Sequence, residues 1–194
     1  MDEHEIRSEH AENPSPGGAR LFRSVLKEYL WPLIAGVILA GFIMTFIAQS
    51  YIVEGSSMEP TLHHGERLLI DKVTYRFKEP SRGDIVVLST PRAAFVKRVI
   101  AVGGDHLEIK DGVVYLNGRP MQESYIAEPT EGEWGPYDVP DGTVFVMGDN
   151  RNFSNDSRRG VGFLDVNKIR GRAFIRYYPL HKITLLRRPQ IEGQ

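Results

Sequence analysis

The sequence predicts a mainly β protein preceded by one transmembrane helix. No charged residue occurs from Leu30 to Val53, and about 20 apolar residues suffice to cross a hydrocarbon core of about 30 Å. The rest of the chain contains short apolar runs interrupted by Gly, Pro and Asp, which is the spacing of antiparallel strands. Alternating apolar residues also flank Asp111-Gly112, a pair typical of a tight hairpin turn.

The N-terminal part divides where the apolar run begins. Residues 1–28 are mostly polar, so we expect a disordered cytoplasmic segment, and residues 29–50 form the predicted signal anchor. Phe46 stands where a cleavage site needs a small residue, which favours an uncleaved anchor over a removable signal peptide. Basic residues precede the span and are missing from residues 51–66, which predicts a cytoplasmic N-terminus. A buried helix of a globular protein is the alternative.

The strands follow the anchor. Residues 107–118 predict a hairpin, whereas residues 121–142 are rich in Pro, Gly and acids without periodicity and predict a loop. The remaining strands are predicted from short apolar runs at Arg67–Asp71, Asp84–Ser89, Phe95–Val102, Val144–Met147 and Arg172–Tyr178.

The composition argues against several function classes. A formal net charge of -1 with both signs interspersed gives no basic stripe, so we expect no nucleic-acid binding. The chain has no cysteine and therefore no disulfide, thiol nucleophile or thiolate zinc site. The adjacent His63 and His64 lack supporting ligands at a usual spacing, so we predict neither a metal nor a cofactor.

Ser57 lies just beyond the apolar segment and is the candidate nucleophile. Serine attacks well only when a base removes its proton, and Lys97 is the best candidate because burial in an apolar strand lowers the pKa of a lysine. An exposed surface lysine is the ordinary alternative. Arg98 is expected on the opposite face of the same strand, where it can pair with a carboxylate.

Two rival bases are less well placed. Lys72 is close to Ser57 in sequence, but its neighbours Asp71 and Thr74 indicate a solvated position. His106 with Asp105 has the composition of a Ser-His-Asp triad, yet it follows a Gly-Gly turn that leads into the hairpin. Nothing in the sequence places that histidine beside Ser57.

A polar loop, residues 148–158, directly follows the apolar run Val144–Met147. Its hydroxyls, carboxylates and arginines suit a shell that orients a neighbouring amine. A merely solvated turn is the alternative.

Together these segments resemble the type I signal peptidases, membrane-bound serine proteases that remove signal peptides from exported proteins. The resemblance covers about Leu30 to Tyr178, with the anchor and the motifs in the family's order. The matching motifs are Ser57-Met58-Glu59-Pro60-Thr61, Lys97-Arg98-Val99 with Gly103-Gly104-Asp105, and Gly148-Asp149-Asn150-Arg151 through Asp156-Ser157-Arg158.

The resemblance implies roles for individual residues. Ser57 attacks the scissile carbonyl, neutral Lys97 accepts its proton, and Ser154 orients the lysine. Asp149, Arg98, Asp156 and Arg158 correspond to residues that hold the shape of the site.

The oxyanion hole is one point where the chain departs from some relatives. The Ser57 N–H would be one oxyanion donor, but Gly55 stands where some members of the family have a serine whose hydroxyl is the second. A water molecule and a backbone amide remain open as its replacement.

The resemblance also implies a domain plan. We expect a signal-peptidase-type antiparallel β-sheet catalytic core formed by residues 51–104 and 139–182. A small inserted β-hairpin lobe is expected at residues 105–138, and a C-terminal tail at residues 183–194.

The expected substrate lies extended against strand edges and is cut after an Ala-x-Ala-type site. Shallow apolar pockets for it would be lined by Ile52, Val53, Phe95 and Val96. The expected partners are signal peptides of preproteins, the lipid bilayer and the protein translocation machinery. The expected location is the bacterial cytoplasmic membrane, with a single span and the catalytic domain on the outer face. A Ser/Lys peptidase for another exported precursor and a non-catalytic anchored β domain are the alternatives.

Overall fold

The computed structural model describes residues 25–89 and 94–189. The chain divides into two compact units, residues 1–43 and 44–194, and each is described by itself. The predicted disorder of residues 1–28 falls almost entirely outside the described residues.

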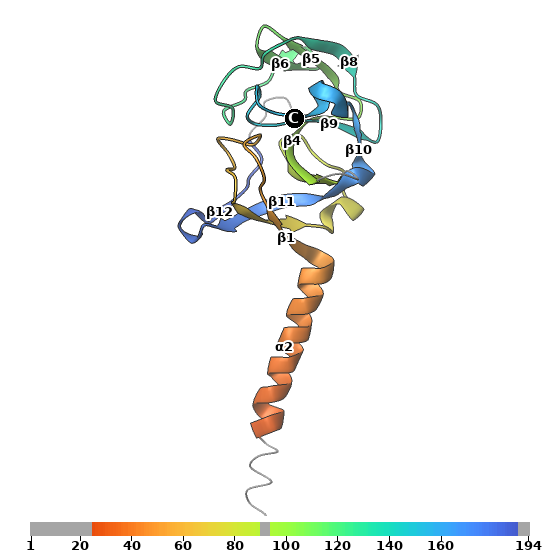
Figure 1. The fold of residues 1–194 in the computed structure, drawn as a ribbon. Helices are drawn as coiled ribbons and strands as arrows, with labels where there is room; N and C mark the ends of the chain where they lie inside the picture. Colours follow the sequence, from red (N-terminus) through yellow and green to blue (C-terminus); the bar gives the residue numbers. More distant parts are fainter. Residues whose placement is uncertain (1–24, 90–93, 190–194) are drawn as a thin grey trace, which may run out of the picture. The chain divides into compact units, whose positions relative to one another are not determined.

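One long helix runs from Leu26 to Ile47 in successive segments η1 (Leu26–Leu30), α2 (Trp31–Phe42) and η2 (Ile43–Ile47) (Figure 1). Its 22 residues correspond to a length of about 33 Å, enough to span a hydrocarbon core. None of its residues is buried in the described part of the chain. The alternative of a helix inside a globular core therefore has no support.

The helix lies three residues nearer the N-terminus than the predicted anchor, residues 29–50. Its first turns include the charged residues Lys27 and Glu28, and Ala48–Ile52 form strand β1. The sequence did not show where the helix ends and β1 begins, because both lie in one charge-free run. Hydropathy alone does not distinguish the end of an apolar helix from the start of an apolar strand.

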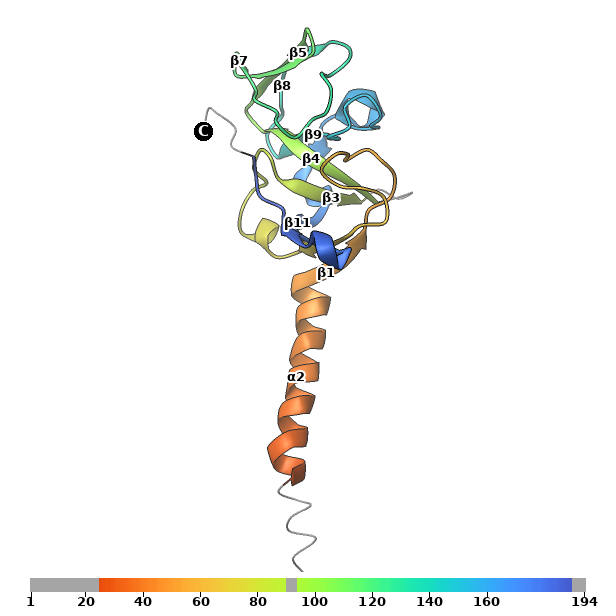
Figure 2. The same cartoon turned by 90° about the vertical axis from the view of Figure 1, so that its left-hand side faces the viewer.

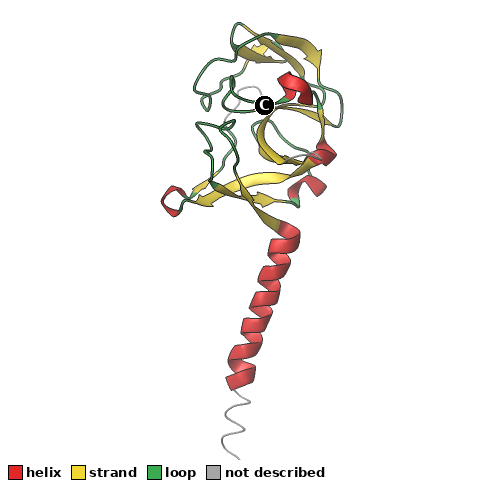
Figure 3. Cartoon of the chain, in the orientation of Figure 1, coloured by secondary structure: helices red, strands yellow, loops and turns green. Residues whose placement is uncertain are grey.

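The main sheet is antiparallel and has the strand order β1-β2-β11-β3-β4-β9-β10, with β12 paired to β11. Figure 1 labels several of these strands, and Figure 3 distinguishes the strands from the loops that connect them. The strands of the main sheet confirm the predicted runs and the mainly β fold class. Their bounds are β1 (Ala48–Ile52), β2 (Arg67–Asp71), β3 (Ile85–Ser89), β4 (Ala94–Val102), β9 (Thr143–Met147), β10 (Leu164–Asp165), β11 (Ile169–Tyr178) and β12 (Thr184–Leu185). The short helical turns between them are η3 (Thr74–Arg76), η4 (Ser157–Val161), η5 (Val166–Lys168) and η6 (Leu180–Lys182).

A second, smaller antiparallel sheet has the order β7-β6-β5-β8. It contains β5 (His106–Lys110), β6 (Val113–Leu116), β7 (Arg119–Pro120) and β8 (Trp134–Asp138). The predicted hairpin is confirmed, because β5 pairs with β6 and the turn residues Asp111 and Gly112 both have positive φ, at 52° and 81°.

The prediction of a continuous loop at residues 121–142 is wrong, because β8 lies within it. Gly135 and Pro136 stand inside this strand and break its apolar alternation. Proline is tolerated there since β8 is an edge strand, whose outer N–H groups need no partner in the sheet.

Two hydrophobic clusters fix the parts that carry the candidate site. One contains Ile100 of β4, Phe145 of β9 and Leu107 of β5, so the small sheet packs onto the main sheet. The other joins Met58 and Val96, and thereby buries the loop after β1 against β4. Figure 2 shows β3, β4 and β9 side by side, as their pairing requires.

Candidate active site

The loop between β1 and β2 carries Ser57. Its base is closed by two backbone hydrogen bonds, Val53 N–H to Glu66 O at 2.9 Å and Gly65 N–H to Val53 O at 2.9 Å. Met58, directly after the serine, is 1% exposed and anchors the loop in the core. Ser57 is thus half-buried on a loop whose flanking residues are held in place.

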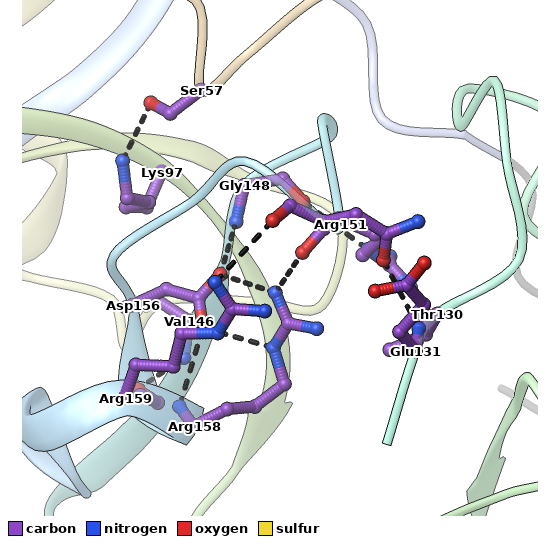
Figure 4. Close-up of polar contacts among 12 residues, drawn as sticks. Ser57, Lys97, Thr130, Glu131, Val146, Gly148, Arg151, Asp156, Arg158 and Arg159 are labelled. Carbon is purple, nitrogen blue, oxygen red and sulfur yellow. Dashed lines mark hydrogen bonds and ion pairs between the residues drawn. The ribbon is translucent and has the colours of Figure 1, made fainter.

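Strand β4 places Lys97 beside this serine. Lys97 Nζ lies 2.7 Å from Ser57 Oγ and 3.1 Å from its second partner, the Val96 carbonyl oxygen (Figure 4). The lysine is 4% exposed, and burial lowers its pKa to about 8, although the Asp156 and Asp149 carboxylates act in the opposite direction. A substantial neutral fraction at mildly alkaline pH follows from this burial.

Arg98 lies next to Lys97 in β4 and confirms the expected pairing with a carboxylate. Its guanidinium donates to both oxygens of Asp149, at 2.7 and 2.6 Å, and to Gly83 O at 3.0 Å. Both partners of this ion pair are almost fully buried. The pair links β4 to the loop that follows β9, and Lys97 is the amine beside Ser57.

The loop after β9 approaches the backbone of the β1–β2 loop directly. Asn150 donates from its backbone N–H to Ser57 O and from Nδ2 to Ser56 O, both at 3.1 Å. A Cβ atom at Gly148 would lie 2.3 Å from Ser57 O. Only glycine therefore fits this approach without displacement of the backbone.

Asp156 and Arg158 support the same loop. Asp156 accepts from the Gly148 N–H at 3.0 Å and forms an ion pair with Arg158 at 2.9 Å (Figure 4). Arg158 and the Gly148 N–H both favour the ionised carboxylate and hold the pKa of Asp156 below its usual value against the effect of burial. These contacts fix Gly148, and through it the position of the Ser57 backbone.

Ser154 is buried, and its Cβ and Oγ lie against Gly148. Among the described residues, the Ser154 hydroxyl has no partner that meets the geometry of a hydrogen bond. It nevertheless lies close enough to Asp156 to favour the ionised form of that carboxylate. The structure does not join Ser154 to Lys97 by a hydrogen bond. Its orienting role stays a prediction.

Comparison with known proteins identifies the family of this chain. The sequence profile of the family described as "Signal peptidase, peptidase S26" matches residues 26–178. The chain belongs to this family.

Relatives of the family from different bacteria match most of the chain. It is 44% identical over 162 residues to a probable signal peptidase I-2 of Synechocystis sp., covering 79% of this chain and 74% of that protein. It is 38% identical over 173 residues to a signal peptidase I of Bacillus licheniformis, covering 83% and 93%. A crystal structure of a signal peptidase I from Enterococcus faecalis aligns with a TM-score of 0.44 and 31% identity, covering 49% of this chain and 97% of the other.

In this member of the S26 family, the turn before Ser57 contains a contact that the sequence did not reveal. The Gly55 N–H donates to His64 Nδ1 at 3.1 Å, and Gly55 has a φ of 80°. The Gly55 amide is thus already engaged, whereas the Ser57 N–H donates to no partner within residues 25–89 and 94–189. The identity of a second oxyanion donor remains an open prediction.

The residues predicted to line the substrate pockets separate into two pairs. Ile52 and Phe95 are 49% and 37% exposed, whereas Val53 and Val96 are buried in the hydrophobic core. Tyr51 OH donates to Ala94 O at 2.7 Å and ties β1 to β4. Exposed apolar surface at the predicted substrate strands therefore comes mainly from Ile52 and Phe95.

The rival bases have other partners. Lys72 Nζ donates to Thr45 O at 2.9 Å, at the end of the long helix. His106 Nδ1 lies 2.8 Å from Asp138 Oδ1, within the small sheet. Within the part of the chain that the structure describes, neither side chain forms a hydrogen bond with Ser57.

Sequence reasoning missed a buried cluster centred on Arg151. Arg151 pairs with Glu123 and donates to Thr130 Oγ1 at 2.9 Å and to Gly148 O at 3.1 Å. The Cζ atoms of Arg151 and Arg98 lie 5.8 and 4.0 Å from the centroid of the Tyr125 ring. Glu123 and Tyr125 come from the segment predicted as loop, which carries no periodic pattern to mark them as buried.

Proposed function

We propose that this protein is a membrane-anchored serine endopeptidase that removes N-terminal signal peptides from exported preproteins. Membership of the S26 family supports the peptidase activity. The names of the relatives, signal peptidase I, support the substrate class. The contact of 2.7 Å between Lys97 Nζ and Ser57 Oγ carries the mechanistic part of the proposal.

In the proposed acylation step, Ser57 Oγ attacks the scissile carbonyl while neutral Lys97 takes the hydroxyl proton. The Ser57 N–H, which has no partner among the described residues, is suited to stabilise the oxyanion that develops on the carbonyl oxygen. Protonated Lys97 then gives its proton to the leaving amine of the mature protein, and the signal peptide remains as an ester on Ser57. In the second step Lys97 takes a proton from the water that attacks the ester carbonyl. Lys97 then gives this proton to Ser57 Oγ as the ester bond breaks, so the signal peptide leaves with a C-terminal carboxyl group and both side chains regain their starting state.

An extended substrate fits this mechanism because main-chain pairing with strand edges gives affinity without demanding particular side chains. We propose that the peptide lies beside β1 and the N-terminal part of β4, near exposed Ile52 and Phe95. Small residues at the first and third positions before the cut would match the shallow surface there. The anchor would hold enzyme and signal peptide in one bilayer, which raises their effective concentration.

The decisive experiment measures cleavage of a preprotein with an Ala-x-Ala site by the full chain and four variants. Ser57→Ala and Lys97→Ala are expected to abolish cleavage, and Lys97→Arg equally, because a guanidinium does not lose its proton at working pH. Lys72→Ala is the matched control and is expected to cleave normally. Normal cleavage by Lys97→Ala or Lys97→Arg would disprove the mechanism.

Depletion of the protein from cells tests the substrate class. Accumulation of many different uncleaved preproteins is the expected result. Accumulation of one precursor alone would instead identify a Ser/Lys peptidase dedicated to that protein.

A further inference from the structure

A basic pocket of about 310 Å³ lies on the β unit, lined by none of the residues of the candidate active site. Its cationic residues come from two separate parts of the chain. Lys72, Arg76 and Lys78 belong to the segment after β2, and Arg170 belongs to β11. Among the described lining residues, the single carboxylate is that of Glu79, so positive charge exceeds negative charge by three.

Most of this positive charge is uncompensated. Within the described ranges no salt bridge joins Arg76, Lys78 or Arg170 to a carboxylate, and all three are exposed. Nearby Arg172 and Arg188 differ, because each faces the buried Asp84, at 3.8 and 2.6 Å. The pocket therefore offers charge that the fold itself does not use.

Lys72 connects the pocket to the end of the membrane-spanning helix. Its Nζ donates to Thr45 O at 2.9 Å, and its backbone N–H donates to Ile47 O at 3.0 Å. Both carbonyls belong to the last turn of that helix. A residue that closes the end of a membrane span lies near the boundary between hydrocarbon and headgroups, where lipid phosphates are concentrated.

We propose that this pocket binds the phosphate headgroup of an anionic phospholipid in the leaflet where the helix ends. Arginine guanidinium groups match phosphate oxygens in geometry and charge. Each basic residue near an anionic membrane surface adds roughly fivefold to binding. A zwitterionic headgroup would bring an ammonium group into a pocket that is already cationic, so the pocket selects phosphatidylglycerol over phosphatidylcholine. This site is independent of the proposed peptidase mechanism.

The test uses the full chain with Ser57→Ala, reconstituted with equal amounts of phosphatidylglycerol and phosphatidylcholine. Native mass spectrometry then counts the lipids of each kind that stay bound. The pocket variant is Arg76→Glu with Arg170→Glu. The matched control, Lys110→Glu with Arg119→Glu, changes the net charge equally on exposed residues of the small sheet. Arg76→Gln with Arg170→Gln serves as a milder pair if the charge reversals unfold the protein.

We expect the parent chain to retain phosphatidylglycerol at least about fivefold over phosphatidylcholine, the pocket variants to lose this preference, and the control to keep it. Inorganic phosphate at millimolar concentration should not displace the lipid. Absence of a preference, or equal loss in pocket and control variants, would overturn the proposal. Displacement by inorganic phosphate would also overturn it, in favour of a free-phosphate site. None of these results bears on preprotein cleavage, which the Ser57 and Lys97 variants test separately.

Discussion

Gly148 lies where the loop after β9 comes close to the backbone of the β1–β2 loop. A Cβ atom at this position would lie 2.3 Å from Ser57 O and 2.4 Å from Ser154 Oγ. Gly148→Ala should therefore displace the Ser57 backbone, and a misplacement of about 1 Å costs on the order of 100-fold in rate. The measurement is kcat for a preprotein, with circular dichroism to show that the variant is folded. Unchanged kcat in the folded variant would show that this close approach has no role in positioning the serine.

The pKa of Lys97 predicts the pH dependence of cleavage. Burial lowers this pKa to about 8, and the base must be neutral, so the protonated and inactive form dominates below that pH. We expect kcat/KM to rise about tenfold per pH unit below this pKa and to level off above it. A profile that is flat between pH 6 and 9 would contradict a lysine base.

Asp156 gives a variant that moves this profile in a known direction. Its negative charge raises the pKa of Lys97 against the larger effect of burial, so Asp156→Asn should shift the rise in kcat/KM toward lower pH. Asp141→Asn, on an exposed loop, is the control and should leave the midpoint unchanged. Because loss of the Arg158 ion pair also lowers the overall rate, the midpoint is the relevant quantity. A midpoint shifted to higher pH would be the wrong sign.

His64 is expected to position the turn that carries the nucleophile. Its Nδ1 accepts the Gly55 N–H at 3.1 Å, and one hydrogen bond of this kind contributes about 1 kcal/mol, or roughly fivefold in rate if it acts on the transition state. His64→Leu removes the acceptor and should lower kcat by about that factor with little change in KM. His64→Asn retains an acceptor at the δ position and should restore kcat. The same loss in both variants would refute this role.

Among the elements, the strands whose own sequence carries a clear apolar pattern were predicted from the sequence. The hairpin β5–β6 follows from alternation around Asp111-Gly112, and β4 follows from apolar residues on both sides of Lys97-Arg98. Strand β8 was not predicted, because Gly135-Pro136 interrupts its apolar pattern. Its position is decided by pairing with β5 rather than by its own sequence. Local propensity cannot report such a long-range pairing.

The candidate site likewise contains residues that the sequence predicted and contacts that it did not predict. Ser57 and Lys97 were predicted as partners from chemistry and from motif order, but their distance depends on how the β1–β2 loop packs against β4. The sequence predicted that Arg98 pairs with a carboxylate, because adjacent strand residues face opposite sides, but it did not identify Asp149 as the partner. The partners of Arg151 were not foreseen, since Glu123 lies in a segment without periodicity. Whether a charged pair is buried depends on how distant segments pack together, and a local sequence pattern does not contain this information.

Glu123 tests how far the segment before β8 supports the candidate site. Its carboxylate pairs with Arg151, and the two side chains are 5% and 0% exposed. Glu123→Gln leaves a buried arginine without its counter-charge, which should lower the free energy of unfolding by about 3 kcal/mol. Urea unfolding in detergent measures this change. Glu128→Gln, at an exposed residue with a weaker contact of 3.3 Å to Asn152, is the control and should change stability little. Equal effects would show that burial of the ion pair is unimportant.

For the whole molecule, the remaining question is the side of the membrane on which the β unit lies. Basic residues before the span and their absence from residues 51–66 favour a cytoplasmic N-terminus and an outward β unit. The basic pocket adds positive charge to the β unit through residues that are distant in sequence from the span. Labelling of single introduced thiols measures the orientation directly.

The absence of cysteine makes this measurement clean, because a single introduced thiol is the only site for a maleimide. We expect Ser124→Cys, at an exposed position of the β unit, to react with a membrane-impermeant maleimide in cells whose cytoplasmic membrane is intact. Ser8→Cys, before the span, should react only after that membrane is permeabilised. The unsubstituted chain is the control for background labelling. The reverse pattern would place the candidate site in the cytoplasm, where it would not meet a translocated signal peptide.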